Sequence, residues 1–180
     1  MGALESLQRR RSQPKVTDEA PTSAELLPLI AAAARVADYG DLKPWRLIEV
    51  RGDARDRVGR AIAEASGLMG KDALKTAAKP LRAPLLIAVV ACRRSSHKVD
   101  VWEQDAAAAG VAHMLSLLLD EAGWGVMWRS GRQTRTDAVR AAHRLEAGEE
   151  LLGWLYVGRP AKQKSEPKRR LPPEAYVSSL

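Results

Sequence analysis

The sequence predicts an α+β domain in which one central sheet is flanked by helices. Helical patterns outnumber strand patterns, and the two kinds are interleaved along the chain rather than segregated. The longest helical segment, 101–122, is rich in Ala and apolar nearly all round, so neighbouring elements must cover most of its sides. We therefore expect it at the centre of the sheet or in a subunit interface. With 180 residues, 46% of them hydrophobic, the chain can bury a core of its own.

The first helix is predicted over residues 1–11, with Leu4 and Leu7 on one apolar face. Basic residues stand at its C-terminal end, where positive charge complements the helix dipole. Gln13-Pro14 then prevents the helix from continuing.

A second helix begins after Thr22, because Thr22 and Glu25 have the spacing of a capping box. We expect it to end near Ala37, with Pro28 marking its first turn or a local kink. The side chains expected to face inward are Leu26, Leu27, Ile30, Ala33 and Ala34.

The remaining elements follow from apolar periodicity and from turn residues. Apolar runs predict strands over 45–50, 84–92, 125–129 and 151–157. Amphipathic patterns predict helices over 53–66 and 136–144, and a partly helical segment over 69–82. We expect a mixed or antiparallel sheet in one domain over residues 1–160, followed by an extended basic tail over 161–180.

Composition places limits on the class of protein. The most apolar run, 106–119, is shorter than the roughly 20 residues that a membrane-spanning helix needs, and the N-terminal segment lacks the pattern of a secretory signal. The single cysteine, Cys92, excludes an internal disulfide and a metal cage built from cysteines. We therefore expect a cytoplasmic protein whose chemistry does not depend on a pair of thiols.

Several common sites are missing from the sequence. It has no GxxxxGK[ST] phosphate loop, and Gly123 with Gly125 forms a lone GxG without a third glycine. The histidines at 97, 113 and 143 do not have the spacing of a local metal site. These absences disfavour hydrolytic and metal chemistry, so we expect no metal and favour either binding or chemistry carried by an organic cofactor.

Three short segments could bind an anionic, planar ligand. Arg10-Arg11-Ser12 offers two guanidinium groups and a hydroxyl to a phosphate, although a solvated basic helix end fits about as well. Arg35 and Tyr39 share one helix face, where a surface Arg beside a packing Tyr is the simpler interpretation. Trp128-Arg129-Ser130-Gly131 combines a flat aromatic, a cation and a hydroxyl at a strand end. By contrast, we expect His113 to be a buried, hydrogen-bonded side chain of the long helix.

Together these segments resemble one family, the small NAD(P)H-dependent nitroreductases that carry FMN. The likeness runs from residue 3 to residue 158. Its motifs are Arg10-Arg11-Ser12, Arg35-Val36-Ala37-Asp38, Pro44-Trp45, Arg82-Ala83-Pro84, His97-Lys98-Val99, Trp102-Glu103-Gln104, Trp128-Arg129-Ser130-Gly131 and Leu155-Tyr156-Val157-Gly158. No single motif is strong, but their order and spacing make the match specific.

The resemblance implies an intertwined homodimer with FMN at the interface, held by residues of both subunits. The implied FMN-binding residues are Arg10, Arg11, Ser12, Arg35, Tyr39, Trp128, Arg129 and Ser130. A stretch assigned to NAD(P) in relatives matches Leu118, Leu119, Asp120, Glu121, Ala122 and Gly123. No side chain is expected to be catalytic, because the cofactor carries the chemistry.

The activity implied by this resemblance is a two-step, ping-pong oxidoreduction. NADH or NADPH gives hydride to flavin N5, and the electrons then pass to a nitroaromatic, a quinone or a similar electrophilic small molecule.

Two alternatives stay open. Tyr39 stands where relatives often have His, and Asp41-Leu42-Lys43 replaces a more polar loop, so the chain could be a sensor, storage or dehalogenating flavoprotein. The second alternative is a nucleic-acid-binding protein, which a net charge of +7 and basic clusters at 9–11, 93–94 and 168–170 would suit. Against it, these clusters are scattered and lack interleaved aromatic residues.

Overall fold

The computed structural model describes residues 2–161 and 172–180, and its centre is a four-stranded antiparallel sheet. The strands are β1 (Trp45–Val50), β2 (Leu85–Cys92), β3 (Gly125–Arg129) and β4 (Glu149–Gly158), in the order β1-β2-β4-β3. The helices are α1 (Ala3–Arg9), α2 (Ser23–Ala33), α3 (Asp53–Ala65), α4 (Gly70–Ala77), α5 (Val101–Glu121) and α6 (Asp137–Ala142). Short 3-10 turns are η1 (Tyr39–Asp41), η2 (Lys79–Arg82), η3 (Arg132–Arg135) and η4 (Pro173–Tyr176).

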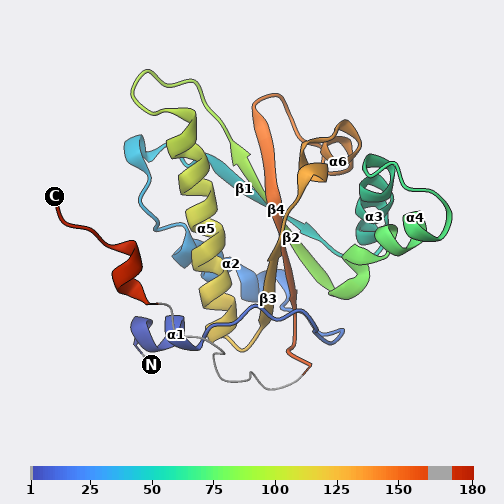
Figure 1. Cartoon of the computed structure of the whole chain (residues 1–180), viewed down its shortest axis with the longest axis horizontal. Coiled ribbons are helices and arrows are strands. Elements are labelled where there is room, and N and C mark those ends of the chain that lie inside the picture. The colour runs from blue at the N-terminus through green and yellow to red at the C-terminus, as the bar shows by residue number, and fades with distance from the viewer. Residues whose placement is uncertain (1, 162–171) are drawn as a thin grey trace.

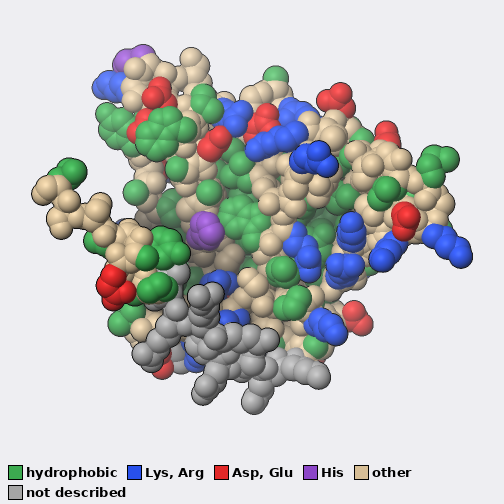
Figure 2. All heavy atoms as spheres, in the orientation of Figure 1, with side chains coloured by type: hydrophobic (Ala, Val, Ile, Leu, Met, Phe, Trp, Pro, Cys, Tyr) green, Lys and Arg blue, Asp and Glu red, His purple; other side chains and the backbone are tan. Residues whose placement is uncertain are grey.

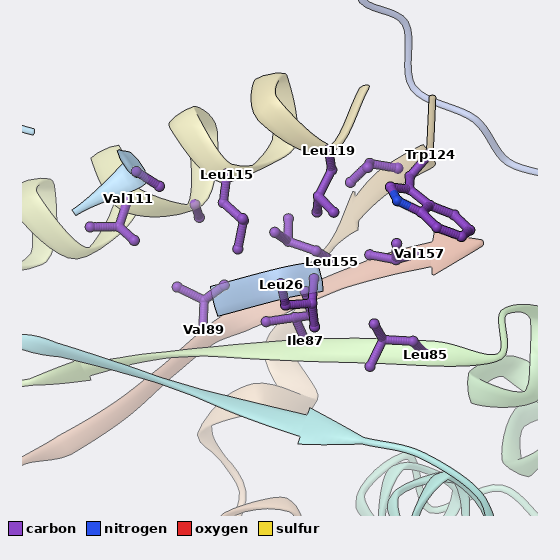
Figure 3. Packing of buried hydrophobic residues seen from close by; sticks show 13 residues of the cluster. Leu26, Leu85, Ile87, Val89, Val111, Leu115, Leu119, Trp124, Leu155 and Val157 are labelled. Carbon is purple, nitrogen blue, oxygen red and sulfur yellow. The ribbon is translucent and has the colours of Figure 1, made fainter. Parts of the chain in front are cut away.

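Helices cover both faces of the sheet (Figure 1). On one face, α5 and α2 bury a cluster that includes Leu26, Leu115, Ile87 and Leu155 (Figure 3). On the other face, α3 and α6 pack against alternate residues of the same strands, among them Trp154. Because successive strand residues point to opposite faces, one sheet supplies both clusters. The predicted α+β class with a central sheet is confirmed, and the sheet is antiparallel.

Local sequence signals explain the start of α2. The Thr22 hydroxyl accepts a hydrogen bond from the Glu25 backbone N–H, and the Glu25 carboxylate accepts one from the Thr22 backbone N–H. This is the predicted capping box. Pro28 lies inside the helix rather than at its first turn, and the helix ends at Ala33 rather than near Ala37.

Some predicted core positions lie on the surface. Of the apolar positions expected to face inward on α2, Leu26 and Ala33 are buried, whereas Leu27 and Ala34 are exposed. On α1, Leu4 and Leu7 are exposed and Ser6 is the buried residue, so the predicted apolar face of this helix is uncovered in the single chain.

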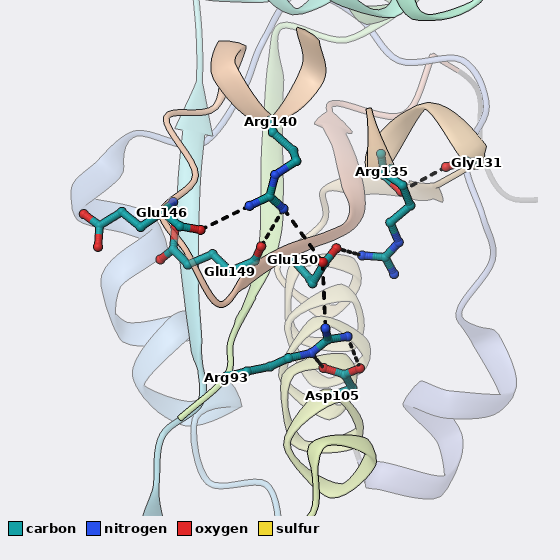
Figure 4. A network of polar contacts seen from close by, with 9 residues as sticks. Arg93, Asp105, Gly131, Arg135, Arg140, Glu146, Glu149 and Glu150 are labelled. Atoms are coloured by element: carbon teal, nitrogen blue, oxygen red, sulfur yellow. Dashed lines mark hydrogen bonds and ion pairs between the residues drawn. The ribbon is translucent and has the colours of Figure 1, made fainter. Parts of the chain in front are cut away.

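An ion-pair network ties β2, α5, α6 and β4 together at one end of the sheet (Figure 4). Arg93 donates to Asp105 on α5, with a separation of 2.7 Å between Nη2 and Oδ2. Its other amino group lies 3.8 Å from Glu150 of β4, which also contacts Arg135 and Arg140. Arg93 of the basic cluster at 93–94 is therefore neutralised within the fold, and the predicted cluster at 168–170 lies outside the described residues.

No helix in the described parts of the chain combines the length and hydropathy required to cross a bilayer. The same residues contain no group of three or more His, Cys, Asp or Glu side chains placed to hold a metal ion.

Candidate functional site

The edge strand β3 positions two predicted site residues on opposite faces of the sheet. Trp128 points toward α5, where its ring centroid lies 5.0 Å from that of His113. Arg129, the next residue, points the other way, and its guanidinium carbon lies 5.2 Å from the ring centroid of Tyr156. This alternation places an aromatic surface on one side of β3 and a cation on the other.

Beside Trp128, the N-terminal segment completes a small cavity of about 160 Å³. After α1 the chain becomes extended, Ser12 forms a parallel bridge with Val126, and the backbone N–H of Gln13 donates to the Val126 carbonyl at 2.9 Å. These contacts fix Arg10 and Ser12 against β3. The lining residues are Arg10, Ser12, His113, Ser116, Val126 and Trp128.

Arg11 does not join this cavity. Its Nη1 donates to the backbone carbonyls of Gln8 and Arg10, at 2.7 and 2.6 Å, so the side chain folds back on its own helix end. The structure therefore brings together Arg10, Ser12 and Trp128 of the predicted set, and leaves Arg11 apart from them.

On the other face, Arg129 and Ser130 line a cavity of about 300 Å³ between the sheet and the segment from α3 to η2. Its other lining residues are Ile62, Ser66, Leu68, Thr76, Lys79, Arg82, Gln133, Trp154 and Tyr156. Arg82 and Arg129 also line a neighbouring cavity of about 580 Å³, together with Pro14, Lys15, Val16 and Ala161. The two guanidinium groups thus stand between two adjoining hollows.

The charged side chains that line these three cavities are all positive among the described residues. The cavities' described lining residues include no Asp or Glu. The cations that line them are Arg10, Lys15, Lys79, Arg82 and Arg129. Figure 2 shows Lys and Arg side chains grouped on the surface over the start of β2, and η2, which carries Lys79 and Arg82, directly precedes that strand in the sequence. Such a surface suits an anionic ligand.

Two further features fit a bound ligand. The Nε atom of Arg129 is buried and has no hydrogen-bond partner among the described residues. Tyr156 is buried, and this burial raises the pKa of its phenol to about 12, so it keeps its proton beside Arg129. A buried donor without a partner is uncommon in folded proteins and is often completed by a ligand or an ordered water.

Arg35 and Tyr39 line none of these cavities. Val36 packs against Gly110 in the middle of α5, and Gly40 packs against Val99, just before that helix begins. Ser116, which lines the small cavity, is 15 positions beyond Val101, the first residue of α5, which corresponds to about 22 Å along the helix. Tyr39 is 63% exposed. A single chain therefore holds Tyr39 near the other end of α5, and it does not place Arg35 in a cavity with the other predicted site residues.

The stretch predicted for NAD(P), 118–123, forms the last turn of α5 and its reversal. Leu119 and Asp120 are buried, and the Glu121 carboxylate accepts a hydrogen bond from the Ser6 hydroxyl at 3.1 Å. Gly123 adopts φ 86°, and its N–H donates to the Asp120 carbonyl. Half of this stretch serves packing and helix termination, while Glu121, Ala122 and Gly123 are exposed.

Sequence reasoning missed several residues of these cavities. His113 is not the buried side chain that we expected: it is exposed on α5 and rests against Trp128. Lys79 and Arg82 lie in the segment whose periodicity was ambiguous, and nothing local marks them as neighbours of Arg129. The one sequence feature that could have suggested Lys79 and Arg82 as ligand-binding residues is their positive charge directly before an apolar strand.

Comparisons with known proteins agree with this architecture. A family model described as "Nitroreductase family" matches residues 7–159. "Putative NAD(P)H nitroreductase YdjA" from Escherichia coli strain K12 is 33% identical over 168 residues, which cover 92% of each chain.

Solved structures share the fold at lower sequence identity. A nitroreductase-like family protein from Bacillus cereus has a TM-score of 0.86 at 21% identity, covering 100% of this chain and 96% of that one. A mutant of the FMN and NADPH-dependent nitroreductase NfnB from sphigopyxis sp. strain HMH has a TM-score of 0.77 at 20% identity, covering 99% of each chain.

Proposed function

Since the chain belongs to the nitroreductase family, we propose that it is an NAD(P)H-dependent flavoenzyme that binds FMN along β3 and reduces an electrophilic small molecule. The observation that carries this proposal is the set of three cavities on the two sides of β3, around Trp128 and Arg129, whose described lining residues include cations and no carboxylates.

The residues present fit a flavin mononucleotide. Arg10 and Ser12 offer a guanidinium and a hydroxyl in a cavity of about 160 Å³, which is small for a whole ligand and suits a phosphate. The cavity of about 300 Å³ combines apolar walls with Lys79, Arg82 and Arg129, which suits a flat ring system that gains electrons. The unpartnered Nε of Arg129 supplies a donor there. When bound, FMN supplies hydride acceptance from NAD(P)H and electron delivery to the acceptor.

We place Arg35 and Tyr39 in the site of a second copy of the chain. Neither residue lines any of the three cavities, and Gly40, next to Tyr39, packs near the opposite end of α5 from the Arg10 cavity, so we expect both residues to reach the flavin of a second copy. Exposed large apolar side chains support this pairing: they are Leu4, Leu7 and Met114, together with Trp102, which is 68% exposed. Exposed apolar surface of this kind often marks an interface with another chain. The expected assembly is a homodimer with two shared sites.

The chain's own side chains would bind and orient rather than react. Arg129 and Lys79 would stabilise negative charge on the ring system, and Trp128 would pack at the junction of the site with α5. The electron acceptor is a nitroaromatic, a quinone or a similar electrophile, and the reaction follows a ping-pong order. The residues 118–123 remain a prediction for the NAD(P) contact, as does a cytoplasmic location.

The test begins with purified full-length protein. We expect flavin absorption bands, FMN as the cofactor released on denaturation, and bleaching of those bands when NADH or NADPH is added without oxygen. Protein that gains no flavin after incubation with FMN would contradict the proposal. Bound flavin that neither nucleotide reduces would favour the sensor or storage alternative.

A pair of variants locates the site. Arg129→Gln should weaken FMN binding about ten- to a hundredfold, because a charge-assisted donor is lost. Arg132→Gln is the matched control, since Arg132 is exposed three residues away on η3 and lines none of the three cavities.

A further inference from the structure

His113 is the one imidazole that faces the cavity beside Trp128. It lies on the outward side of α5, and its ring is inclined by 48° to the indole of Trp128 at a centroid distance of 5.0 Å. Since β3 holds Trp128, this contact restrains the imidazole beside the cavity that Arg10 and Ser12 also line. The arrangement brings residues of α5, β3 and the N-terminal segment to one point.

The polar groups of this cavity are suited to an anion. Within the described residues, the side chains of Arg10, Ser12 and His113 form no hydrogen bond with the protein, so their donors are available. Ser116 is different, because its hydroxyl already donates to the Ala112 carbonyl at 2.8 Å. Three donors from two separate segments, the N-terminal segment and α5, therefore converge on a space of about 160 Å³ with no carboxylate among its described lining residues.

We propose that His113 binds the phosphate of the flavin mononucleotide together with Arg10 and Ser12, and that it makes retention of the cofactor depend on pH. This inference rests on the proposed FMN-binding function and assigns His113 a contact within it.

The charges around His113 determine the direction of that dependence. The residues one turn away on α5 are Ala109, Gly110, Ser116 and Leu117, none of them charged. Trp128 on β3 is also uncharged, so Arg10 is the charged side chain that faces the imidazole across the cavity. A phosphate between them offsets the repulsion of two cations, and a charged imidazole binds it more tightly than a neutral one. Imidazoles carry less charge at pH 8 than at pH 6, so the part of the FMN affinity that depends on His113 should be smaller at pH 8.

The experiment compares FMN with riboflavin, which lacks the phosphate. Both are titrated by fluorescence into the flavin-free full-length chain and into His113→Gln at pH 6 and pH 8. We expect His113→Gln to weaken FMN binding at pH 6 about ten- to a hundredfold, with a smaller loss at pH 8. Riboflavin binding should be unchanged. His97→Gln is the matched control, because His97 is an exposed histidine in the loop before α5.

Two results would overturn the inference. His113→Gln could leave both the preference for FMN over riboflavin and its pH dependence at the native level. Alternatively, it could weaken FMN and riboflavin equally, which would show that His113 acts only by supporting Trp128. Circular dichroism and gel filtration establish that each variant folds and assembles as the native chain does.

Failure of the proposed function would look different, because the native chain itself would then bind no FMN. In that case inorganic phosphate, titrated while the imidazole C–H proton resonances are followed by NMR, decides the role of His113. A phosphate-dependent shift of one histidine resonance that is missing in His113→Gln supports an anion site, and the absence of any shift rejects it.

Discussion

The indole N–H of Trp154 donates to Nε2 of His143 across 2.8 Å in the buried layer beneath α6. The other ring nitrogen, Nδ1, lies 2.7 Å from the Val139 carbonyl. Nδ1 must therefore carry the proton, and Nε2 must be the acceptor, which defines a neutral imidazole. Burial is the main cause that lowers the pKa of His143 below its ordinary value of 6.5.

Stability should therefore fall as the pH drops below about 6.5. In that range the unfolded chain takes up a proton at His143 that the folded chain does not, so protonation favours unfolding. Urea unfolding measured between pH 5 and pH 8 should show this slope, and His143→Gln should reduce it. His97→Gln should leave the slope as it is. An unchanged slope in His143→Gln would contradict the assignment of a neutral buried imidazole.

Glu149 should control the reactivity of the single cysteine. Burial, and then the hydrogen bond from Sγ to Glu149 at 3.4 Å, raise the pKa of Cys92 to about 11. Arg46 holds the pKa of Glu149 at about 2, so this carboxylate stays charged beside the thiol. We expect Cys92 to react slowly with a disulfide reagent at pH 8 and Glu149→Gln to react several-fold faster. Equal rates in folded protein would show that burial alone protects the thiol.

The sequence located most of the fold but not its outer surface. The strands over 45–50 and 125–129 have the predicted bounds, because runs of strand-forming residues end at clear turn signals. Leu4 and Leu7 show the limit of the same reasoning. Amphipathic spacing identifies an apolar face, but it does not tell whether that face packs within the chain or against another copy.

The candidate site was less predictable, because it depends on contacts distant in sequence. Arg10 and Arg11 are chemically alike, and only the carbonyls of Gln8 and Arg10 show that Arg11 turns away. The expected position of His113 was wrong because α5 is apolar nearly all round, so no polar stripe marks its outer side. Arg82 and Arg129 line the same cavity although they are 47 positions apart in the sequence, and no local sequence pattern predicts that they meet.

Gly153 should be essential to the position of Trp128. It adopts φ 147°, and an added Cβ would lie 2.5 Å from Nε1 of Trp128 and 2.6 Å from the Arg129 carbonyl oxygen. Gly153→Ala should therefore cost more than about 2 kcal/mol in free energy of unfolding and weaken FMN binding.

Gly67→Ala is the matched control for this substitution. Gly67 also has a positive φ, 63°, but its added Cβ would meet nothing within 4 Å. It should cost about 1 kcal/mol of backbone strain and leave FMN binding unchanged. We would measure stability by urea unfolding and FMN affinity by flavin titration. Equal losses of stability and affinity in the two variants would contradict the close approach of Gly153 to Trp128.

The central claim is that each flavin site uses Arg10 of one copy and Arg35 of the other. The most direct test measures FMN bound to a hybrid dimer of one Arg10→Ala chain and one Arg35→Ala chain, carrying different affinity tags. Both parent homodimers should bind FMN weakly. In the hybrid, one site would lack both arginines and the other would retain both, so we predict native affinity at one of the two sites. A hybrid that binds FMN no better than its parents would contradict the shared site.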